Sequence, residues 1–483
     1  MGESAPPASG GASATRVTPV GGRALARAAG GGFVSRTLAR LLGAWGARIG
    51  LCWIAVMLCA AVGAPLLASS HPLLWSVGGR VSSPWLEHLT RVDVVLFGAT
   101  LAAVVAAAWR VPGGAGVPGA PGGARFAGWV LAVSGAVAGA AGRSFVELLR
   151  DNPQPAAGRV AVAAAGLVAL AVGLSVLVAA ARAAVGRGRW RAVSWALAAG
   201  LCGLLALAPL DPPAAVVFGQ YREAEAAGGV DWVVRAPLPF SPNDAQRDAM
   251  AREGRDARLE TPSLAHPLGT DRAGQDVLSR MVHATRIALA IGLIATGIAV
   301  AIGVLVGGLM GYFAGWVDLL GMRLVEVFSA IPVLFLLIMI VAFYGRSLTL
   351  MMVVIGLTGW VGYALFVRAE FLKLRSMDYV VAARALGLPL RSILLRHMLP
   401  NGVTPVLVLA SFGIASAILA ESTLSFLGLG LVEEPSWGQL LNQSRAAPGQ
   451  WGLLIFPGLA IFLTVFAYNL VGEALRDALD VRS

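Results

Sequence analysis

Long runs of apolar residues, separated by short polar segments, occupy most of the 483-residue chain. A helix needs about 20 apolar residues to cross roughly 30 Å of hydrocarbon, and a backbone in lipid must satisfy its own hydrogen bonds. Each run therefore predicts a membrane-spanning α-helix, and the fold is expected to be all-α and polytopic, with about ten spans. The runs lie at 48–68, 92–109, 127–142, 160–182, 192–210, 284–314, 326–344, 349–368, 404–430 and 453–475.

Charged residues are few and are placed unevenly along the chain. Only 13% of residues are charged, against 57% that are hydrophobic, and the formal net charge is +11. The arginines flank apolar runs and do not form a basic domain, which favours membrane topology over nucleic-acid binding. The hydrophilic segment 211–283 instead carries eleven acids against eight arginines, so it is expected on the outer side. The arginine-rich loops expected inside carry Arg110, Arg125, Arg182, Arg187, Arg189, Arg191, Arg368, Arg375, Arg384, Arg391 and Arg396.

The residue pattern offers little chemistry of its own. Cys52, Cys59 and Cys202 lie in apolar runs without a Cys-x-x-Cys motif, and the histidines are scattered, so neither a metal site nor a cofactor is expected. Lys373 is the only lysine and has no glycine-rich phosphate loop before it, so the usual ATPase machinery is missing. We therefore do not expect this chain to be an enzyme.

One polar segment between two apolar runs predicts a helical hairpin. From Ser376 the sequence favours a helix as far as Leu386, and Gly387 can take the left-handed conformation that ends helices. Pro389 suits the first turn of a second helix, and Pro400 is expected to end that helix. The hairpin is thus expected over 376–400.

The first helix of this hairpin could offer a surface to another protein. Ala382 and Ala383 have small side chains that would let a partner approach closely, and Tyr379, Ala383 and Leu386 are expected to share a face. The alternative is a solvated loop whose arginines only set topology. Such a loop would not need two short helices, so docking is the preferred interpretation.

The same residues resemble a known signature. They are similar to the cytoplasmic loop of permease subunits of binding-protein-dependent ABC importers, in which this loop supplies a coupling helix that docks on a separate ATPase. The family loop often begins with a glutamate, where this chain has Val381, so an ionic contact from that position does not carry over. The coupling residues implied by the resemblance are Tyr379, Ala382, Ala383, Arg384, Gly387, Ile393, Leu399, Pro400 and Asn401.

Further motifs resemble the dipeptide/oligopeptide branch, the peptide/nickel permease family, in family order. They are HPLGTDRAGQDVLSR at 266–280, GYFAGWVD at 311–318, SAIP at 329–332, SFLGLG at 425–430 and YNLVGEALRDALD at 468–480. The implied organisation is a disordered cytoplasmic segment 1–35, a first span 36–70, an inserted region 71–210 with about four extra spans, the outer segment 211–283, a type I permease domain 284–475 and a cytoplasmic tail 476–483.

The resemblance also implies the assembly and the cargo. It implies an inner-membrane importer of di- or oligopeptides, with both termini cytoplasmic, built with a second homologous permease, ATPase subunits and an outer substrate-binding protein. Segment 211–283 and the loop around Trp437 and Gly438 are candidates to meet that protein. Nickel, glutathione or another small solute stays open as cargo. A stand-alone ion-coupled transporter or channel is the alternative from another class, and a membrane-embedded enzyme is a third.

Two features of the apolar runs have open interpretations. Glu421, with Ser425 nearby, lies inside a span, where a charge is costly and should face protein; it either lines the translocation path or gate, or makes a structural interhelical hydrogen bond. Glu326 is expected at the inner end of its span. Glycines at 303, 307, 311 and 315 predict a smooth helix ridge that packs either within this chain or against a second permease.

Overall fold

The computed structural model describes residues 37, 40–90, 92, 93, 96, 97, 100, 218–249, 254, 256–402, 404–431 and 434–479. The expected spans at 127–142, 160–182 and 192–210, and most of the one at 92–109, lie outside these residues. So do the expected disordered segment 1–35, the inner-loop arginines between 110 and 191, and the last residues, 480–483. The expected count of ten spans therefore stays a prediction.

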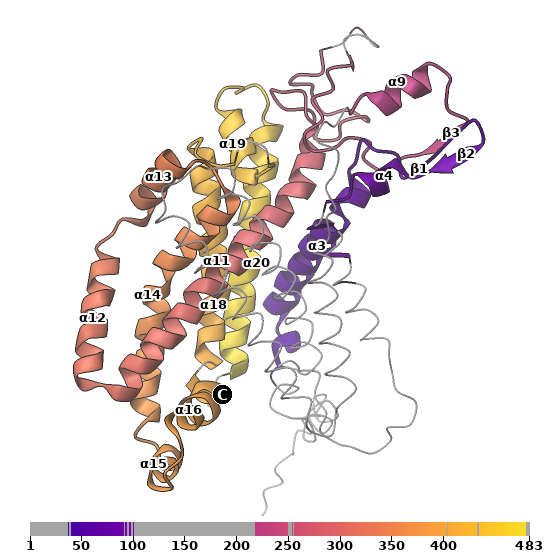
Figure 1. The fold of residues 1–483 in the computed structure, drawn as a ribbon. Coiled ribbons are helices and arrows are strands. Elements are labelled where there is room, and N and C mark those ends of the chain that lie inside the picture. The colour runs from indigo at the N-terminus through magenta and orange to yellow at the C-terminus, as the bar shows by residue number, and fades with distance from the viewer. Residues whose placement is uncertain are drawn as a thin grey trace, which may run out of the picture.

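Long apolar helices form the body of the described structure (Figure 1). Five of them are long and apolar enough to cross a membrane, and a sixth span results if one bent pair is counted together. This confirms a mostly helical, polytopic membrane protein. The five are α3 (Trp45–Leu67), α11 (Val277–Phe313), α14 (Leu348–Leu374), α18 (Thr404–Phe426) and α20 (Gly452–Leu479).

The run expected as one span at 326–344 is instead two helices. α12 (Gly315–Ser329) and α13 (Val333–Tyr344) meet at an angle of 69°. Pro332 accounts for the break, because proline has no N–H to donate and disfavours helical geometry in the residue before it. α12 also begins eleven residues earlier than the apolar run, at Gly315, which like the preceding Ala314 has a positive φ.

The glycine ridge packs inside this chain. A Cβ added at Gly303 would meet Tyr363 and the backbone of Trp360, and one at Gly307 would meet the backbone of Ala364. Gly311 likewise approaches Arg368 and Phe371, so α11 and α14 lie in close backbone contact. The expected fourth member, Gly315, does not belong to the ridge, because it lies in the turn after α11 with open space around it.

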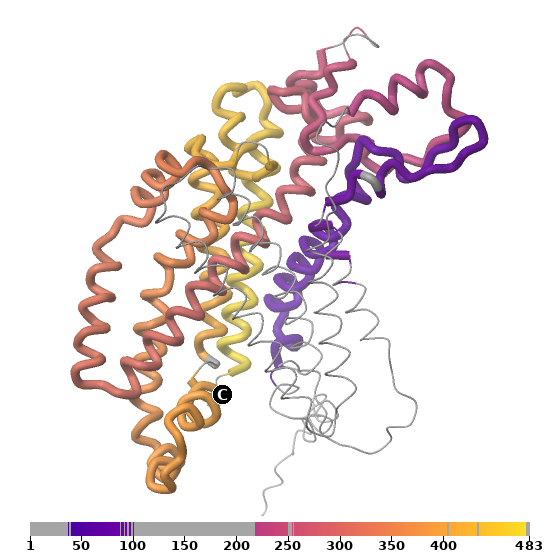
Figure 2. Tube along the Cα trace, in the orientation of Figure 1, coloured from indigo at the N-terminus to yellow at the C-terminus, as the bar shows by residue number. Residues whose placement is uncertain are grey.

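The N-terminal and C-terminal spans lie side by side, as Figure 2 shows for α3 and α20. Ala47 of α3 packs with Ala474 and Ala478 of α20. Closer to the sheet, Met57 of α3 packs with Ile461 of α20. A Cβ at Gly50 would press on the carbonyl of Ala467. The first span is thus part of the same bundle as the C-terminal half.

The chain is not entirely helical, which corrects the all-α expectation. β1 (Leu74–Val77), β2 (Arg80–Ser82) and β3 (Trp232–Val234) form an antiparallel sheet in the order β2-β1-β3. In this sheet Trp75 lies opposite Ser82 on one side and Val233 on the other. Strands of three or four residues are too short to show a readable alternation, and pairing partners this distant in sequence leave no local signal.

Short helices and a buried ion-pair cluster complete the module around this sheet. α4 (Pro84–Glu87) follows the β-hairpin, and α9 (Gln220–Ala226) precedes β3. Arg222 of α9 is 7% exposed and bonds both Asp244 (2.6 Å) and Asp248 (2.7 Å). Asp244 also accepts a hydrogen bond from Ser70, just beyond α3, at 2.5 Å. The cluster therefore fastens segment 218–249 to the end of the first span that lies next to the sheet.

Candidate functional site

The predicted hairpin lies at the end of the bundle away from the β-sheet (Figure 1). α14 ends at Leu374, and α15 (Asp378–Ala385) follows after a short turn. Gly387 has φ 68°, the left-handed conformation predicted for it, and Pro389 is the cap residue before α16 (Leu390–Ser392). The helix, glycine turn and second helix expected from the sequence are all present.

The second arm continues through Pro400 and does not end there. A π-helix, η1 (Ile393–Met398), leads into α17 (Leu399–Gly402), which contains the proline, and α18 begins at Thr404. The prediction that Pro400 ends the helix is therefore wrong. The wider turn of a π-helix directly before the proline changes the local hydrogen-bond pattern, so the missing N–H is tolerated.

The hairpin is anchored by an apolar base. Val380 and Ala383 of α15 pack with Ile393 and Met398 of the second arm, and all four are nearly or fully buried. Phe371, near the end of α14, belongs to the same cluster. Two short helices with a shared core joined to α14 form a stiff attachment, because any tilt of the hairpin must disturb this packing.

The predicted coupling residues divide between this base and the surface. Tyr379, Ala383 and Leu386 do not form one exposed surface, since their exposures are 40%, 4% and 78%. Ala383 is small because it packs inward, so the expectation that it receives a partner is wrong. Ile393 is buried as well, and Leu399 is half-buried. The predicted residues that remain exposed are Tyr379, Ala382, Arg384, Gly387, Pro400 and Asn401.

Hydrogen bonds tie the exposed residues to the hairpin. Arg384 donates to the carbonyl of Arg375 at 2.5 Å, which holds α15 against the end of α14. Asn401 donates to the carbonyl of His397 at 2.9 Å and to the hydroxyl of Tyr379 at 3.4 Å. Asn401 therefore links the second arm to the first.

Several large apolar side chains of the hairpin face outward. We call five of them the tip residues: Tyr379 (40% exposed), Val381 (48%), Leu386 (78%), Leu390 (41%) and Leu395 (53%). Sequence reasoning missed Leu390 and Leu395. The signal available was the persistence of leucines in a segment too polar and too interrupted to span a membrane, since exposed apolar residues that recur in this way are typical of protein contacts.

Glu421 and Ser425 lie far along α18 from the hairpin. Ser425 donates to the Glu421 carboxylate at 2.6 Å and Ser422 at 3.3 Å, and Ser436, in the loop after α18, is a further partner. Glu421 is 2% exposed. The Ser436 contact agrees with the structural alternative, and a role of Glu421 and Ser425 in the path or gate stays a prediction.

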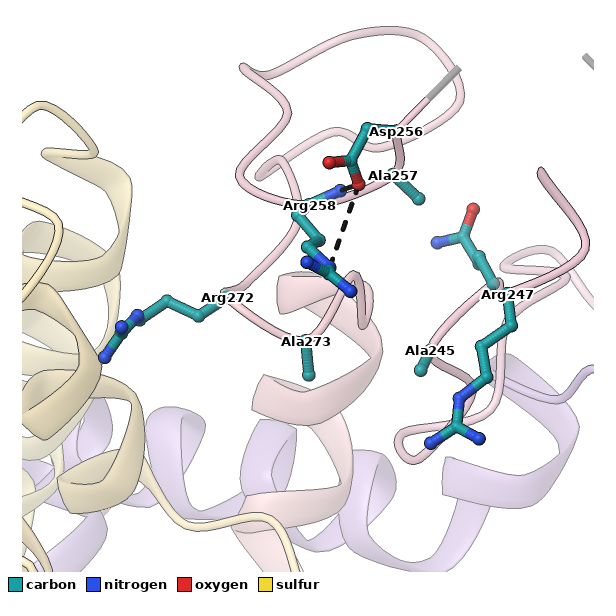
Figure 3. Close-up of a pocket in the computed structure, with 8 residues that line it drawn as sticks. Ala245, Arg247, Asp256, Ala257, Arg258, Arg272 and Ala273 are labelled. Carbon is teal, nitrogen blue, oxygen red and sulfur yellow. Dashed lines mark hydrogen bonds and ion pairs between the residues drawn. The ribbon is translucent and has the colours of Figure 1, made fainter. Parts of the chain in front are cut away.

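At the end of the structure away from the hairpin there is an open hollow of about 580 Å³, drawn in Figure 3. Arg247, Arg258 and Arg272 line it, and Arg258 lies 3.9 Å from Asp256, with both side chains mostly exposed. By contrast, Trp437 is 4% exposed and donates to the carbonyl of Met281, so the loop expected at Trp437 and Gly438 presents neither residue to a partner. Of the two expected contact regions, the hollow is the one that is open.

Comparison with known proteins decides the family. Residues 303–483 match the model of the binding-protein-dependent transport system inner membrane component. The glutathione transport system permease protein GsiD of Pectobacterium atrosepticum is 41% identical over 226 residues, which are 46% of this chain and 74% of that protein. The chain belongs to this permease family. The oligopeptide permease protein OppC of Haemophilus influenzae is 42% identical over 44% of this chain and 70% of its own length. The Escherichia coli permease protein YejE is 43% identical over 52% and 72%.

Membership fixes the general role of the permease. It is a multi-pass inner-membrane subunit of a binding-protein-dependent ABC transporter, and it is the transport subunit, not the catalytic one. Such a system includes an ATPase, a binding protein and a paired permease. The resemblance to the peptide/nickel permease family is thereby confirmed. The matched region begins inside α11 and includes the hairpin, α18 and α20.

Proposed function

We propose that this permease carries short peptides inward and that its hairpin receives the force of ATP hydrolysis from a separate ATPase. The relatives at about 40% identity are named for oligopeptide, dipeptide and glutathione transport. Those cargoes share a peptide backbone of a few residues, which supports peptides over a metal ion as the cargo class.

The observation that carries the coupling role is the contrast between the hairpin's buried base and its exposed apolar tip. The base packs on Phe371, so a push on the hairpin reaches α14 and, through the glycine ridge, α11. The tip residues leave apolar surface uncovered in this chain, and an ATPase groove that covers them would gain from their burial. A contact that transmits force needs a rigid base and an exposed apolar surface that binds the partner. The conformational equilibrium of the transporter shifts only if its contacts with the ATPase differ between the two states.

Leu386→Glu tests this role. The side chain is 78% exposed, so the variant should insert and accumulate normally, while a charge at the docking surface uncouples ATP hydrolysis from uptake. Leu264→Glu is the matched control, because Leu264 is fully exposed on a loop at the opposite end of the molecule. Both are measured for uptake and ATP hydrolysis in the assembled transporter. Normal coupled uptake by Leu386→Glu would refute the docking role.

Two other substitutions are less clean for this purpose. Ala383→Glu would bury a charge in the base, so a loss of uptake would report damaged packing as readily as lost docking. Gly387→Pro is incompatible with φ 68° and would distort the turn itself. Leu386 is preferable because it contributes exposed surface and not structure.

We propose further that the hairpin end is cytoplasmic and that the sheet end faces outward. α3 begins at Trp45, and α20 ends at Leu479, at the same end as the hairpin in Figure 1, which supports cytoplasmic termini. The arginine-lined hollow lies at the other end, where it can meet acidic side chains of the substrate-binding protein.

A further inference from the structure

α12 carries two charged side chains on a face that nothing in the described structure covers. Arg323 donates to Glu326 at 2.6 Å, and the side chains are 69% and 54% exposed. The opposite face packs on the bundle: Val325 is 4% exposed, and Gly321 lies against Met310. At 100° per residue, Arg323 and Glu326 project away from that packed face.

The depth of this pair follows from its neighbours. α12 starts at the hairpin end, where Asp318 is bonded to Arg368. Glu326 lies eight residues beyond Asp318 in α12, about 12 Å further along the helix axis at 1.5 Å per residue. Phe328, half a turn beyond, contacts Trp360 with ring centroids 5.2 Å apart, and Trp360 stands near the centre of the 27-residue span α14. Glu326 therefore lies well inside the span, so the expectation that it marks the inner end of a span is wrong, and Arg323 lies about one turn nearer the hairpin end.

Charges at this depth do not face hydrocarbon. Ionisable groups in spanning segments face protein or a water-filled space, because lipid cannot replace their hydration. Glu421 meets this demand by burial among serines, at 2% exposed. Arg323 and Glu326 bond each other and remain more than half exposed, so they need water or polar groups from outside the described residues.

We propose that the face of α12 bearing Arg323 and Glu326 lines the water-filled translocation path. The adjacent charges of opposite sign suit a cargo that itself carries separated positive and negative groups, as a free peptide does. The identity of the cargo rests on the proposed function. Whether water reaches this face of α12 does not depend on the cargo. The flank of α12 at Leu320 and Leu324 is apolar and belongs outside the path.

Thiol labelling of the assembled transporter in membranes tests the proposal. Cys52, Cys59 and Cys202 are first replaced by serine or alanine, and single variants Arg323→Cys, Glu326→Cys and Leu324→Cys are then made. The probe is a charged, membrane-impermeant methanethiosulfonate reagent. Leu324 is the matched control, because it lies between the two charges in depth, is 44% exposed and points to the apolar flank.

The expected result is labelling of Arg323→Cys and Glu326→Cys on the order of a hundredfold faster than of Leu324→Cys, since hydrocarbon excludes a charged reagent. Equal rates at all three positions, or no labelling at the two charged positions, would overturn the proposal. The readout needs neither cargo nor ATP hydrolysis. A failed coupling role at Leu386 would therefore leave this result standing, and a dry α12 face would leave the coupling role standing.

Discussion

His71 shows how a single residue can make the module around the sheet sensitive to pH. Its ring stacks on that of His88, with centroids 3.7 Å apart and planes at 15°, and its Nδ1 atom is buried without a hydrogen-bond partner. Burial and, to a smaller extent, the nearby His88 together lower the pKa of His71 to about 4, against an opposing effect of Asp244. The folded module thus holds this imidazole neutral over most of the accessible pH range.

The first prediction is a loss of stability of residues 71–88 in acid. An unfolded histidine takes up a proton near pH 6.5, whereas folded His71 does so only near pH 4. Between these values the unfolded state binds more protons, so stability falls as pH falls from about 6.5 to about 4 and is level above that window. Hydrogen exchange of this segment against pH measures the effect, and His71→Phe should weaken the dependence. An unchanged pH profile in the variant would contradict the assignment.

The contact between α11 and α14 shows what sequence can and cannot say about an element. The four-residue spacing of glycines predicted a close helix contact, and the structure shows it within this chain at Gly303, Gly307 and Gly311. The spacing could not identify the partner helix, because a small-residue ridge fits any smooth surface. Nor could it show that Gly315 serves a turn, since the end of α11 depends on the positive φ at Ala314.

Gly307→Ala tests this ridge. The added methyl group would collide with the backbone of Ala364, so the helices must separate, and overpacking of this kind costs about 1–3 kcal/mol. Gly297→Ala on the same helix is the control: its Cβ meets nothing within 4 Å, and alanine favours a helix by up to about 1 kcal/mol. Thermal unfolding in detergent compares the two. A Gly307→Ala variant as stable as Gly297→Ala would rule out the tight contact.

In the hairpin, features set by local backbone conformation could be predicted from the sequence, and features set by packing could not. Gly387 was predicted correctly because a left-handed turn is a local property of the chain. Ala383 and Pro400 were misread because their roles depend on packing: the first fits under Ile393 and Met398, and the second follows a π-turn that accommodates it. Side-chain size shows that a close approach is possible, but not which surface approaches.

At the scale of the whole molecule, the two ends of the permease should bind different partners. We expect the tagged chain, gently solubilised, to bring down an ATPase and a second permease, and to capture the substrate-binding protein after mild cross-linking. Arg258→Glu, in the hollow of Figure 3, should reduce capture of the binding protein and spare the ATPase. Leu386→Glu should reduce capture of the ATPase and leave capture of the binding protein unchanged.

The two variants serve as controls for each other. If both lose both partners, the substitutions have damaged the fold, and if Arg258→Glu keeps the binding protein, the hollow is not its contact.

Long apolar spans made the membrane class and the family readable from sequence. The three-stranded sheet and the depth of Glu326 were not readable, because the first joins distant segments and the second depends on where α12 begins.

The sheet has a consequence for how this chain can change over evolutionary time. The chain leaves the sheet at Ser82 and re-enters it at Trp232. Because β1 pairs with both β2 and β3, the two ends of the intervening stretch are held close together. Residues added to or deleted from the stretch do not alter the gap that the rest of the fold must bridge. Changes in the length of this stretch should therefore leave the sheet and the helices that pack beside it in place.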